Sequence, residues 1–407
     1  MKEGWEIKSL KEVCAKITDG THQTPKYFDE GVVFLSSKNV TNGKIDWDNV
    51  KFIDQKQHLE MHKRVAPRVG DILLAKNGTT GVAARVDRNV VFDIYVSLAH
   101  IRVLNEVTSE YMLYFLNSSI AKKQFNKRLK GSGVPNLHLE EIREVSIPFP
   151  KSLPEQKRIV SIIDEAFETI DKAIKNTQKN LQNAKELFES YLNNVFENGG
   201  EGWEEKKVNE IGNAQTGTTP KTVEKENYGD FIPFIKPADV DFSGIGDIRY
   251  DNEGLSEIGL KKGRKMESGS TLMVCIGATI GKVGFAEQVV SCNQQINSLT
   301  VKNEFEPKFI YYAMTSRAFQ EKVLLEGKGA QATLPIINKS KWENLTISFP
   351  KSKTEQKKYV AKFDTLSLES QKLQEIYLKK IADLDELKKS VLQKAFNGEL
   401  KTATVVV

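Results

Sequence analysis

The residue types that could perform catalysis are sparse in this sequence, and the most suggestive spacing is a Glu-Gln-Lys triplet that occurs twice. Glu155 and Glu355 are each followed two positions later by a lysine, the Glu-x-Lys spacing of metal-dependent nucleases. Each glutamate also completes the pattern Ser-x-x-Glu, in which Ser152 or Ser352 caps a helix and the glutamate reaches back to the capping amide. Such a capping box accounts for both glutamates without catalysis, so the nuclease stays only an alternative.

A metal centre is not indicated by the spacing of histidines and cysteines. His58 and His62 lie one helical turn apart in "HLEMH", but the pattern is not HExxH and no third ligand stands out. Cys14, Cys275 and Cys292 form no Cys-x-x-Cys pair, so we interpret them as buried apolar residues. We therefore expect no metal site.

Sequence motifs for phosphate or cofactor binding are also missing. The chain has no Walker A loop and no G-x-G-x-x-G at a strand-to-helix turn. It has neither a G-x-S-x-G elbow nor the Pro-Pro dipeptide of the amino-methyltransferase signature. The glycine-rich segments "NGTTG" and "IGATIG" fit tight turns better than phosphate loops. We expect a protein with no catalytic centre and no cofactor of its own.

Composition describes an ordinary chain of more than one domain. Its 407 residues exceed the size at which one hydrophobic core stops growing, and 39% hydrophobic with 28% charged residues is typical of soluble proteins. We find no apolar run of membrane-spanning length and no signal-peptide order at the N-terminus, so we expect a cytoplasmic location. Residues 1–150 carry 22 basic and 18 acidic groups, and residues 201–350 carry 18 and 20, so the second half is not a non-specific polyanion binder.

The elements that position these residues are written twice. "FPKSLPEQKRIV" begins at residue 149 and "FPKSKTEQKKYV" begins at residue 349, with eight of twelve residues identical. "GDILLAKNGTTG" is answered by "GSTLMVCIGATIG", and "VSIPFP" by "LTISFP". Repeats of this period are whole domains. We predict mixed α/β domains at 1–150 and 201–350, each followed by a long helix, at 151–200 and 351–407.

Each helical segment carries an apolar stripe. In the first, apolar residues from Ile163 to Val195 alternate at spacings of four and three, which is a coiled-coil seam. A long helix with one stripe needs a partner, and the chain supplies two. We predict two α/β (α+β) domains related by a pseudo-twofold axis and joined by two long helices in an antiparallel coiled coil. The alternative is that each helix packs on its own domain.

In order and duplication, these motifs resemble the specificity subunit of type I restriction-modification systems. The resemblance rests on the repeated "FPKS" phrases, on "ITDGTHQTPKY" and "AQTGTTPK", on "GSGVPNLHLEEIREVSIP" and on the ending "VLQKAFNGEL", and covers essentially the whole chain. It implies a non-catalytic protein with two target-recognition domains, each reading one half of a split DNA sequence, and helices that set the gap. It further implies partners: two methyltransferase subunits that methylate adenine with S-adenosylmethionine, and ATP-driven restriction subunits that translocate and cleave DNA.

Segments 27–66 and 224–265 differ in length and content between the halves, so we expect an asymmetric target. Base edges are read by Arg, Lys, Asn, Gln, Ser or Thr at loop tips. The candidate base-reading residues are Thr21, His22, Gln23, Lys26, Lys76, Asn77, Thr79, Thr80, Thr218, Thr219, Lys221, Lys236, Thr279 and Lys282. The candidate phosphate contacts are Lys127, Arg128 and Lys130.

For the threonines and Asn77, turn formation is an equally good interpretation. Two rival functions also stay open. A stand-alone nuclease would cleave DNA with a metal ion, and a coiled-coil scaffold would bind proteins but no duplex.

Overall fold

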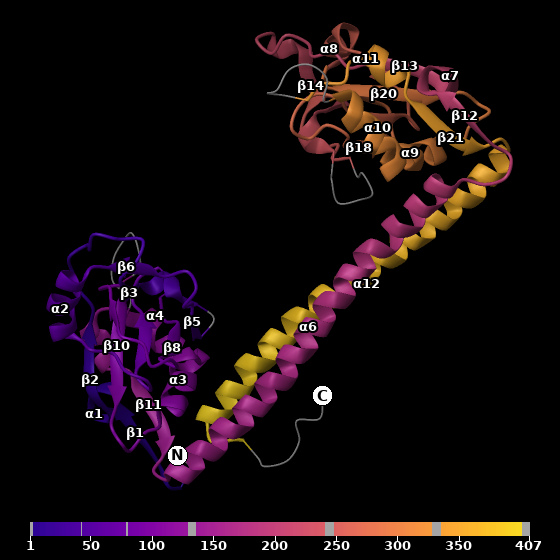
Figure 1. The fold of residues 1–407 in the computed structure, drawn as a ribbon. Helices are drawn as coiled ribbons and strands as arrows, with labels where there is room; N and C mark the ends of the chain where they lie inside the picture. Colours follow the sequence, from indigo (N-terminus) through magenta and orange to yellow (C-terminus); the bar gives the residue numbers. More distant parts are fainter. Residues whose placement is uncertain are drawn as a thin grey trace. The chain divides into compact units, whose positions relative to one another are not determined.

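The computed structural model describes residues 3–41, 43–78, 80–128, 136–240, 248–327 and 335–400. The chain forms two compact units by its internal contacts. The first contains residues up to Thr177 together with the chain from Lys379 onward, and the second contains Gln178–Leu378. Each unit therefore holds one globular part and a portion of both long helices (Figure 1).

The first globular part mixes short strands with short helices. In chain order its main elements are β1 (Trp5–Ser9), α1 (Leu10–Val13), β2 (Cys14–Asp19), β3 (Val32–Leu35), β4 (Val40–Thr41), β5 (Lys44–Ile45), β6 (Lys51–Ile53), α2 (Gln55–Arg64), β7 (Ile72–Ala75), β8 (Ala83–Arg85), β9 (Phe92–Ile94), β10 (Leu98–Val103), α3 (Ser109–Asn117), α4 (Ser119–Arg128), α5 (Leu139–Arg143) and β11 (Ser146–Pro150). The long helix α6 (Leu153–Asn198) follows.

The second globular part follows the same plan. Its main elements are β12 (Trp203–Lys207), α7 (Val208–Ile211), β13 (Gly212–Thr216), β14 (Tyr228–Ile235), β15 (Gly254–Leu255), α8 (Glu257–Lys262), β16 (Lys265–Met266), β17 (Thr271–Val274), β18 (Val283–Phe285), β19 (Val290–Cys292), β20 (Ile296–Val301), α9 (Pro307–Thr315), α10 (Arg317–Gly327), α11 (Lys339–Glu343) and β21 (Thr346–Pro350). The long helix α12 (Lys353–Phe396) follows.

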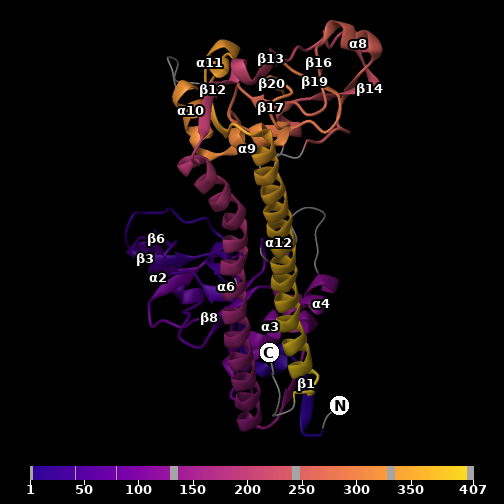
Figure 2. The ribbon, with the colours of Figure 1, turned by 90° about the vertical axis from the view of Figure 1, so that its right-hand side faces the viewer.

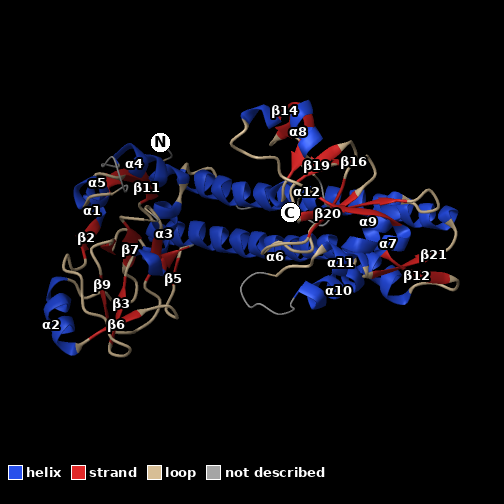
Figure 3. Ribbon diagram, turned by 90° about the horizontal axis from the view of Figure 1, so that it is seen from above, coloured by secondary structure: helices blue, strands red, loops and turns tan. Residues whose placement is uncertain are grey.

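The central sheets of the two parts have the same strand order, whereas the sheet that contains β3 has three strands and its counterpart with β14 has four. An antiparallel sheet of order β2-β10-β7-β8 in the first part matches β13-β20-β17-β18 in the second. The pair β1-β11 matches β12-β21, and the parallel pair β3-β9 matches β14-β19. Helices and strands are interleaved in both parts (Figure 3), which confirms the predicted mixed α/β class.

The two long helices pair within each unit. In the first unit, Ile163 and Ile170 of α6 share one core with Val391 and Phe396 of α12. In the second unit, Phe188 of α6 lies in one core with residues near the start of α12. Because the beginning of one helix meets the end of the other, they run antiparallel, as Figure 2 also shows. The predicted antiparallel pairing is confirmed, and the start of α6 packs on the core of its own globular part as well.

The repeated phrase forms a joint between the sheet and the helix, and its central residue is the glutamine. Gln156 is fully buried; its Oε1 accepts from the Thr108 amide at 2.9 Å, and its Nε2 donates to the carbonyls of Glu106 (2.8 Å) and Pro150 (2.9 Å). It therefore ties the start of α6 to the end of β11 and to the loop before α3.

Gln356 repeats this arrangement in the second part. It is also fully buried, accepts from the Glu306 amide at 2.8 Å and donates to the Pro350 carbonyl at 2.9 Å. A buried amide side chain with its hydrogen bonds satisfied fixes geometry as well as energy, because leaving its partners unpaired is costly.

The glutamate before each joint glutamine lies in the first turn of its helix. The Glu155 carboxylate is bound by its own-turn neighbour Arg158, at 2.7 Å from Nε and 2.8 Å from Nη2. The Glu155 amide lies 3.4 Å from the Ser152 hydroxyl, as in a serine cap, and at the second joint the Ser352 carbonyl accepts from the Glu355 amide at 3.0 Å. Neither glutamate belongs to a metal-ligand cluster among the described residues.

Candidate nucleic-acid interface

Asp19, the last residue of β2, is the centre of a charged cluster in the first globular part. Its carboxylate is 2% exposed and accepts from Lys76 Nζ at 2.7 Å and from Arg64 Nη2 at 2.5 Å, and His22 Nε2 lies 3.3 Å away. Burial alone would raise the pKa of Asp19, but the hydrogen bonds from Lys76 and Arg64 outweigh it and lower the pKa. The loops after β2 and β7 and the end of α2 therefore meet at one anionic group.

The loop after β2 begins with a glycine that the packing requires. A Cβ on Gly20 would lie 1.9 Å from the Ile94 carbonyl oxygen, so any other residue would displace β9. The Thr21 backbone amide donates to the Ile94 carbonyl at 3.0 Å, and the Thr21 hydroxyl accepts from the Gln23 backbone amide at 3.2 Å. The turn interpretation thus accounts for Thr21, while the His22 side chain is 63% exposed and Gln23 is exposed.

Lys26 is held at its main chain rather than at its ammonium group. The backbone amide of Lys26 donates to the side-chain oxygen of Gln57 at 2.9 Å. The side-chain nitrogen of Gln57 donates back to the Lys26 carbonyl at 3.0 Å. Lys26 Nζ lies 5.4 Å from the centre of the Phe28 ring. Helix α2 therefore fixes the backbone of this loop and leaves the lysine exposed.

The loop after β7 differs from the sequence-based expectation. Lys76 is not at a loop tip: it is 6% exposed and its ammonium group pairs with Asp19. The Thr80 hydroxyl donates to the Lys76 carbonyl at 3.2 Å, as the turn interpretation predicts. Asn77 is half-buried and bridges to Asn136, and Thr79 lies outside the described residues. Lys76 is therefore a structural residue here, because burial next to a carboxylate leaves it no reach into solvent.

The basic end of α4 is the candidate phosphate contact. Lys127 is exposed, whereas Arg128 is half-buried and donates to the carbonyls of Gln124 (3.1 Å) and Glu144 (3.4 Å). Lys130 lies outside the described residues. Of these three candidates, Lys127 has the exposure that a phosphate contact needs.

The second globular part repeats the first loop with different side chains. Gly217 stands where Gly20 stands, and its Cβ would lie 2.2 Å from the Asn293 carbonyl oxygen. The Thr218 amide bonds the Cys292 carbonyl at 2.9 Å, and the Thr219 hydroxyl donates to Gln294. Both threonines are half-buried, so their amides and hydroxyls build the turn.

The lysines predicted in the second part have different environments. Lys221 is 78% exposed, with its Nζ 3.6 Å from the Glu224 carboxylate. Lys236 pairs with Glu253. Two further candidates belong to the turn after β17 and are half-buried: Lys282, which donates to the Val240 carbonyl at 3.0 Å, and Thr279.

Two arginines outside the predicted base-reading residues make the same kind of contact in the two parts. Arg64 Nε donates to the Asp19 carbonyl at 3.1 Å, and Arg264 Nη1 donates to the Thr216 carbonyl at 2.7 Å. Asp19 and Thr216 end β2 and β13, the corresponding strands. Each guanidinium is thus fixed to the strand end beside the Gly-Thr loop, and both arginines keep exposed surface. The sequence signals were the basic residues around each arginine, "HKR" at 62–64 and "LKKGRK" at 260–265.

The histidine pair of α2 acquires a third neighbour through the fold. Asp93, which is 1% exposed, lies with Oδ2 2.7 Å from His58 Nδ1 and with Oδ1 3.0 Å from His62 Nδ1. The fold thus places a carboxylate, a group able to ligate a metal, beside the two histidines. Asp93 was not evident because it lies on β9, 31 residues beyond His62.

The three cysteines are buried, as expected. Burial raises the pKa of Cys14, Cys275 and Cys292 to about 12, so all three are protonated thiols at neutral pH. No helix within the described ranges is long and apolar enough to cross a membrane.

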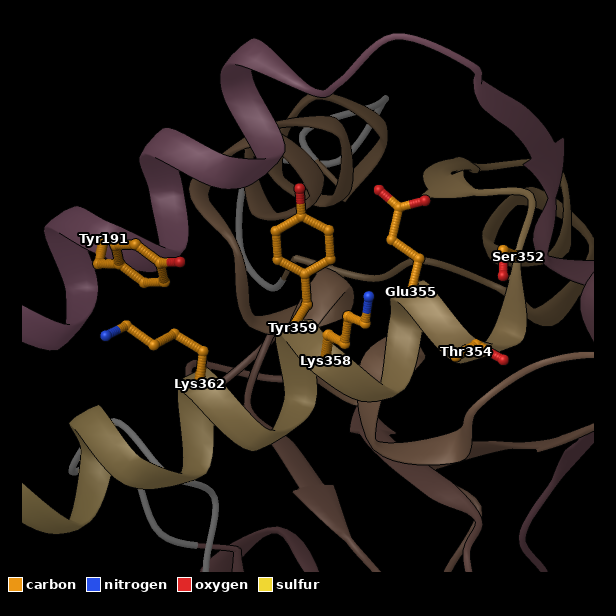
Figure 4. Close-up of a pocket in the computed structure, with 7 residues that line it drawn as sticks. All are labelled: Tyr191, Ser352, Thr354, Glu355, Lys358, Tyr359 and Lys362. Atoms are coloured by element: carbon orange, nitrogen blue, oxygen red, sulfur yellow. The ribbon is translucent and has the colours of Figure 1, made fainter.

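A hollow of about 510 Å³ lies between α6 and α12 in the second unit (Figure 4). Tyr191 comes from α6, whereas Glu355, Lys358, Tyr359 and other lining residues come from the start of α12. Burial raises the pKa of Tyr359, with smaller contributions from Glu355 and Tyr191. The phenol of Tyr359 is thus protonated at neutral pH, and tyrosine, lysine and glutamate side chains line the hollow.

Two copies of one frame, each with a glycine-fixed loop, an anchored arginine and a following long helix, define a duplicated protein built to present two different loop surfaces. The family model for the type I restriction modification DNA specificity domain matches this chain twice, over residues 2–182 and 200–378. The chain belongs to that family.

Individual relatives agree with this assignment. The chain is 31% identical over 182 residues to the type I restriction enzyme HindI specificity subunit of Haemophilus influenzae, covering 43% of this chain and 39% of that protein. It is 26% identical over 198 residues to the MjaVIII specificity subunit of Methanocaldococcus jannaschii, covering 47% and 45%. The matched part therefore spans less than half of each of these relatives.

Solved structures share the fold over nearly the whole chain. One, from a study of complex assembly and conformational transition of the type I R-M system, has a TM-score of 0.73 at 19% identity and covers 98% of this chain and 99% of that one. The HsdS subunit of Thermoanaerobacter tengcongensis has a TM-score of 0.59 at 20% identity and covers 98% of each chain.

Proposed function

We propose that this chain is the DNA-specificity subunit of a type I restriction-modification assembly. Each globular part reads one half of a bipartite, asymmetric DNA target. The observation that carries the proposal is that one frame presents different side chains at the same loop positions: His22 and Gln23 follow Thr21 in the first part, and Thr219 alone separates Thr218 from the Pro-Lys sequence in the second. Equal frames with unequal reading loops fit two unequal half-sites.

Within each reading surface, we assign the anchored arginine the leading role. A guanidinium presents a planar fork of donors that matches guanine or phosphate, and anchoring through one edge leaves the others for DNA. Arg64 with His22, and Arg264 with Thr219, are the proposed contacts beside the two Gly-Thr loops. Lys127 is the proposed phosphate contact of the first part, and it positions without specifying sequence.

The long helices set the gap between the half-sites and dock two methyltransferase subunits. Apolar side chains that no core covers support this docking, among them Leu187 of α6 (45% exposed) and Leu368 and Ile376 of α12 (51% and 58% exposed). Exposed apolar residues on a polar helix are typical of partner surfaces. The hollow lined by Tyr191 and Tyr359 belongs to the same proposed docking surface.

The chemistry belongs to the partners. The methyltransferase subunits methylate adenine with S-adenosylmethionine, and restriction subunits hydrolyse ATP to translocate and cleave DNA. This chain contributes binding and geometry, binds neither S-adenosylmethionine nor ATP itself, and acts in the cytoplasm.

The experiment that tests the proposal is to co-express this chain with the methyltransferase subunit encoded beside it and to map methylated adenines across the host genome. A split motif, with two short half-sites around a fixed gap, supports the specificity role. If the two proteins associate but methylate no motif, the proposal fails and the result favours the coiled-coil scaffold. If the purified chain alone cleaves DNA with a metal ion, and loses that activity on Glu155→Ala and Glu355→Ala substitution, the nuclease function replaces it.

A further inference from the structure

The cluster of His58, His62 and Asp93 is the one group of three described His, Cys, Asp or Glu residues whose ligand atoms converge closely enough to hold a metal ion. Their ligand atoms all lie within 4.8 Å of one another. His58 and His62 stand one turn apart on α2, with ring centres 4.7 Å apart. Both Nδ1 atoms face the same carboxylate on β9.

These side chains are a ligand set for a borderline divalent ion. Imidazole nitrogen and carboxylate oxygen are the ligands of catalytic and structural Zn²⁺ sites, and two histidines four residues apart on a helix present both rings to one ion. Two ligands of a tetrahedral Zn²⁺ with bonds of about 2.0–2.1 Å lie roughly 3.3–3.4 Å apart. The observed separations of 2.7 and 3.0 Å therefore need to open by well under 1 Å.

The chemistry of the cluster allows the ion to enter without leaving a charge unpaired. An imidazole binds a metal through one ring nitrogen and can carry its proton on the other. Because both Nδ1 atoms face Asp93, the carboxylate supplies negative charge next to the cation. The His62 side chain is 31% exposed, which gives a water molecule access to the fourth position.

The corresponding place in the second part shows that the frame does not need this cluster. Counting from the helix caps Asp54 and Ser256, His58 corresponds to Leu260. By strand register, Asp93 corresponds to Ser291, because each faces a phenylalanine of the parallel neighbour strand. At these two places the second part thus carries one apolar and one hydroxyl side chain. The ligand set is an addition specific to the first part.

We propose that His58, His62 and Asp93 bind one divalent transition-metal ion, with Zn²⁺ as the best match. The ion fastens α2 to β9. Helix α2 carries Gln57, which holds the backbone of Lys26, and ends at Arg64. Metal binding therefore stabilises the platform on which the Gly20–Phe28 loop rests, whatever that loop recognises.

The test is a metal titration of the full-length chain after treatment with a chelator. Competition calorimetry with Zn²⁺ should give one tight equivalent, and Co²⁺ should give the intense visible bands of a four-coordinate nitrogen and oxygen site. Removing a ligand should weaken binding more than the roughly 10- to 100-fold loss typical of outer-shell changes. We expect this loss for His62→Gln and for Asp93→Asn. His138→Gln, an exposed histidine outside the cluster, is the matched control and should bind like the unmodified chain.

The measurement also separates the outcomes that overturn the proposal. If the unmodified chain binds no equivalent, or if His62→Gln binds as tightly as His138→Gln, the cluster is not a metal site. Because Asp93 is buried and Asp93→Asn could unfold the domain, the half-exposed His62 carries the decisive comparison. A sulfur-to-cobalt charge-transfer band would assign the metal to cysteine and would also overturn it. None of these readouts requires DNA, so they do not depend on the proposed function.

Discussion

The two globular parts solve the same packing problem with different chemistry. In the first part, the buried Asp71 lies just before β7, at one end of the strands of the central sheet. Its carboxylate accepts from His100 at 2.7 Å and from Arg102 at 2.8 and 2.6 Å. In the second part, the matching strands carry Ser270 and Thr300, whose hydroxyls lie 2.8 Å apart. An ionic cluster in one part is a single hydroxyl pair in the other.

The same contrast recurs at the other end of these strands. Where Asp19 pairs with Lys76 in the first part, Thr216 and Cys275 stand in the second, and Thr216 donates to Asn297 at 2.8 Å instead. Since both parts keep the same strand order in the central sheet, the buried charges do not define the fold. They distinguish the two parts, with consequences for stability and for the residues held at the surface.

The largest expected effect is from removing the centre of an ionic cluster. Asp71→Ala leaves Arg102 and the fully buried His100 without their acceptor, and breaking a buried pair costs about 3–5 kcal/mol. Ser270→Ala removes only a neutral hydrogen bond, worth about 1 kcal/mol. Hydrogen exchange resolved by peptide should show the loss confined to the unit that carries each substitution. Equal costs for the two substitutions would contradict the contrast.

The joint residues should behave alike in both parts, since they belong to the common frame. Gln156→Leu leaves buried backbone groups of Thr108, Glu106 and Pro150 unpaired, and Gln356→Leu does the same to Glu306 and Pro350. We expect a loss of about 2–4 kcal/mol in the free energy of unfolding for each, slightly larger for Gln156. Urea denaturation followed unit by unit measures both. A large loss in one part alone would show that the joint is not shared.

Acid should separate the two parts further. Burial would raise the pKa of Asp71, but hydrogen bonds from Arg102 and His100 hold it well below its usual 3.8, and the pKa of Asp19 is lowered as well. A carboxylate with a lowered pKa in the fold stabilises it above its ordinary pKa, and this stability is lost as the pH falls through the folded value. The first part should therefore lose protection from hydrogen exchange below about pH 4.

In the second part, the lowered pKa values belong to accessible groups. Hydrogen bonds from Thr346 and Lys322 lower the pKa of Glu205, and a hydrogen bond from Lys262 lowers that of Glu224. Exposed pairs contribute little and are screened by salt. If the second part lost its protection from hydrogen exchange at a higher pH than the first part, this account would be contradicted.

A smaller effect is expected from exchanging the chemistry completely. The triple variant Asp71→Ser, His100→Ser and Arg102→Thr gives the first part the side chains of the second at these positions. No buried charge is then left unpaired, so the triple variant should be more stable than Asp71→Ala by about 1–3 kcal/mol, the usual coupling of residues in one network. Chemical denaturation of both variants checks this. Additive losses would show that the charges act independently.

The features that could be predicted from sequence are those that depend on local pattern and repetition. The duplicated phrases predicted the two domains of one class, and the apolar spacing from Ile163 to Val195 predicted the paired helices. Turn chemistry correctly offered an alternative for Thr21 and Thr80. These properties are local, because a helix stripe or a turn is formed by neighbours in the chain.

What could not be predicted depends on contacts between distant segments. Lys76 reads as a loop lysine beside "NGTTG" but is drawn inward by Asp19, 57 residues earlier. Asp93 reaches the histidines only because β9 lies beside α2. In the repeated Glu-Gln-Lys triplet, the sequence pattern assigned a role only to the glutamate, whereas the buried Gln156 makes the hydrogen bonds that hold the joint.

The most direct test of the account changes one reading loop at a time and maps methylation by the assembled complex. The double variant His22→Ala with Arg64→Ala should relax or weaken recognition of one half-site, while the other half-site and the gap stay the same. Arg264→Ala should affect the opposite half-site only. If either variant altered both half-sites, or if both left the whole motif unchanged, the claim that each globular part reads its own half through the anchored arginine would be contradicted.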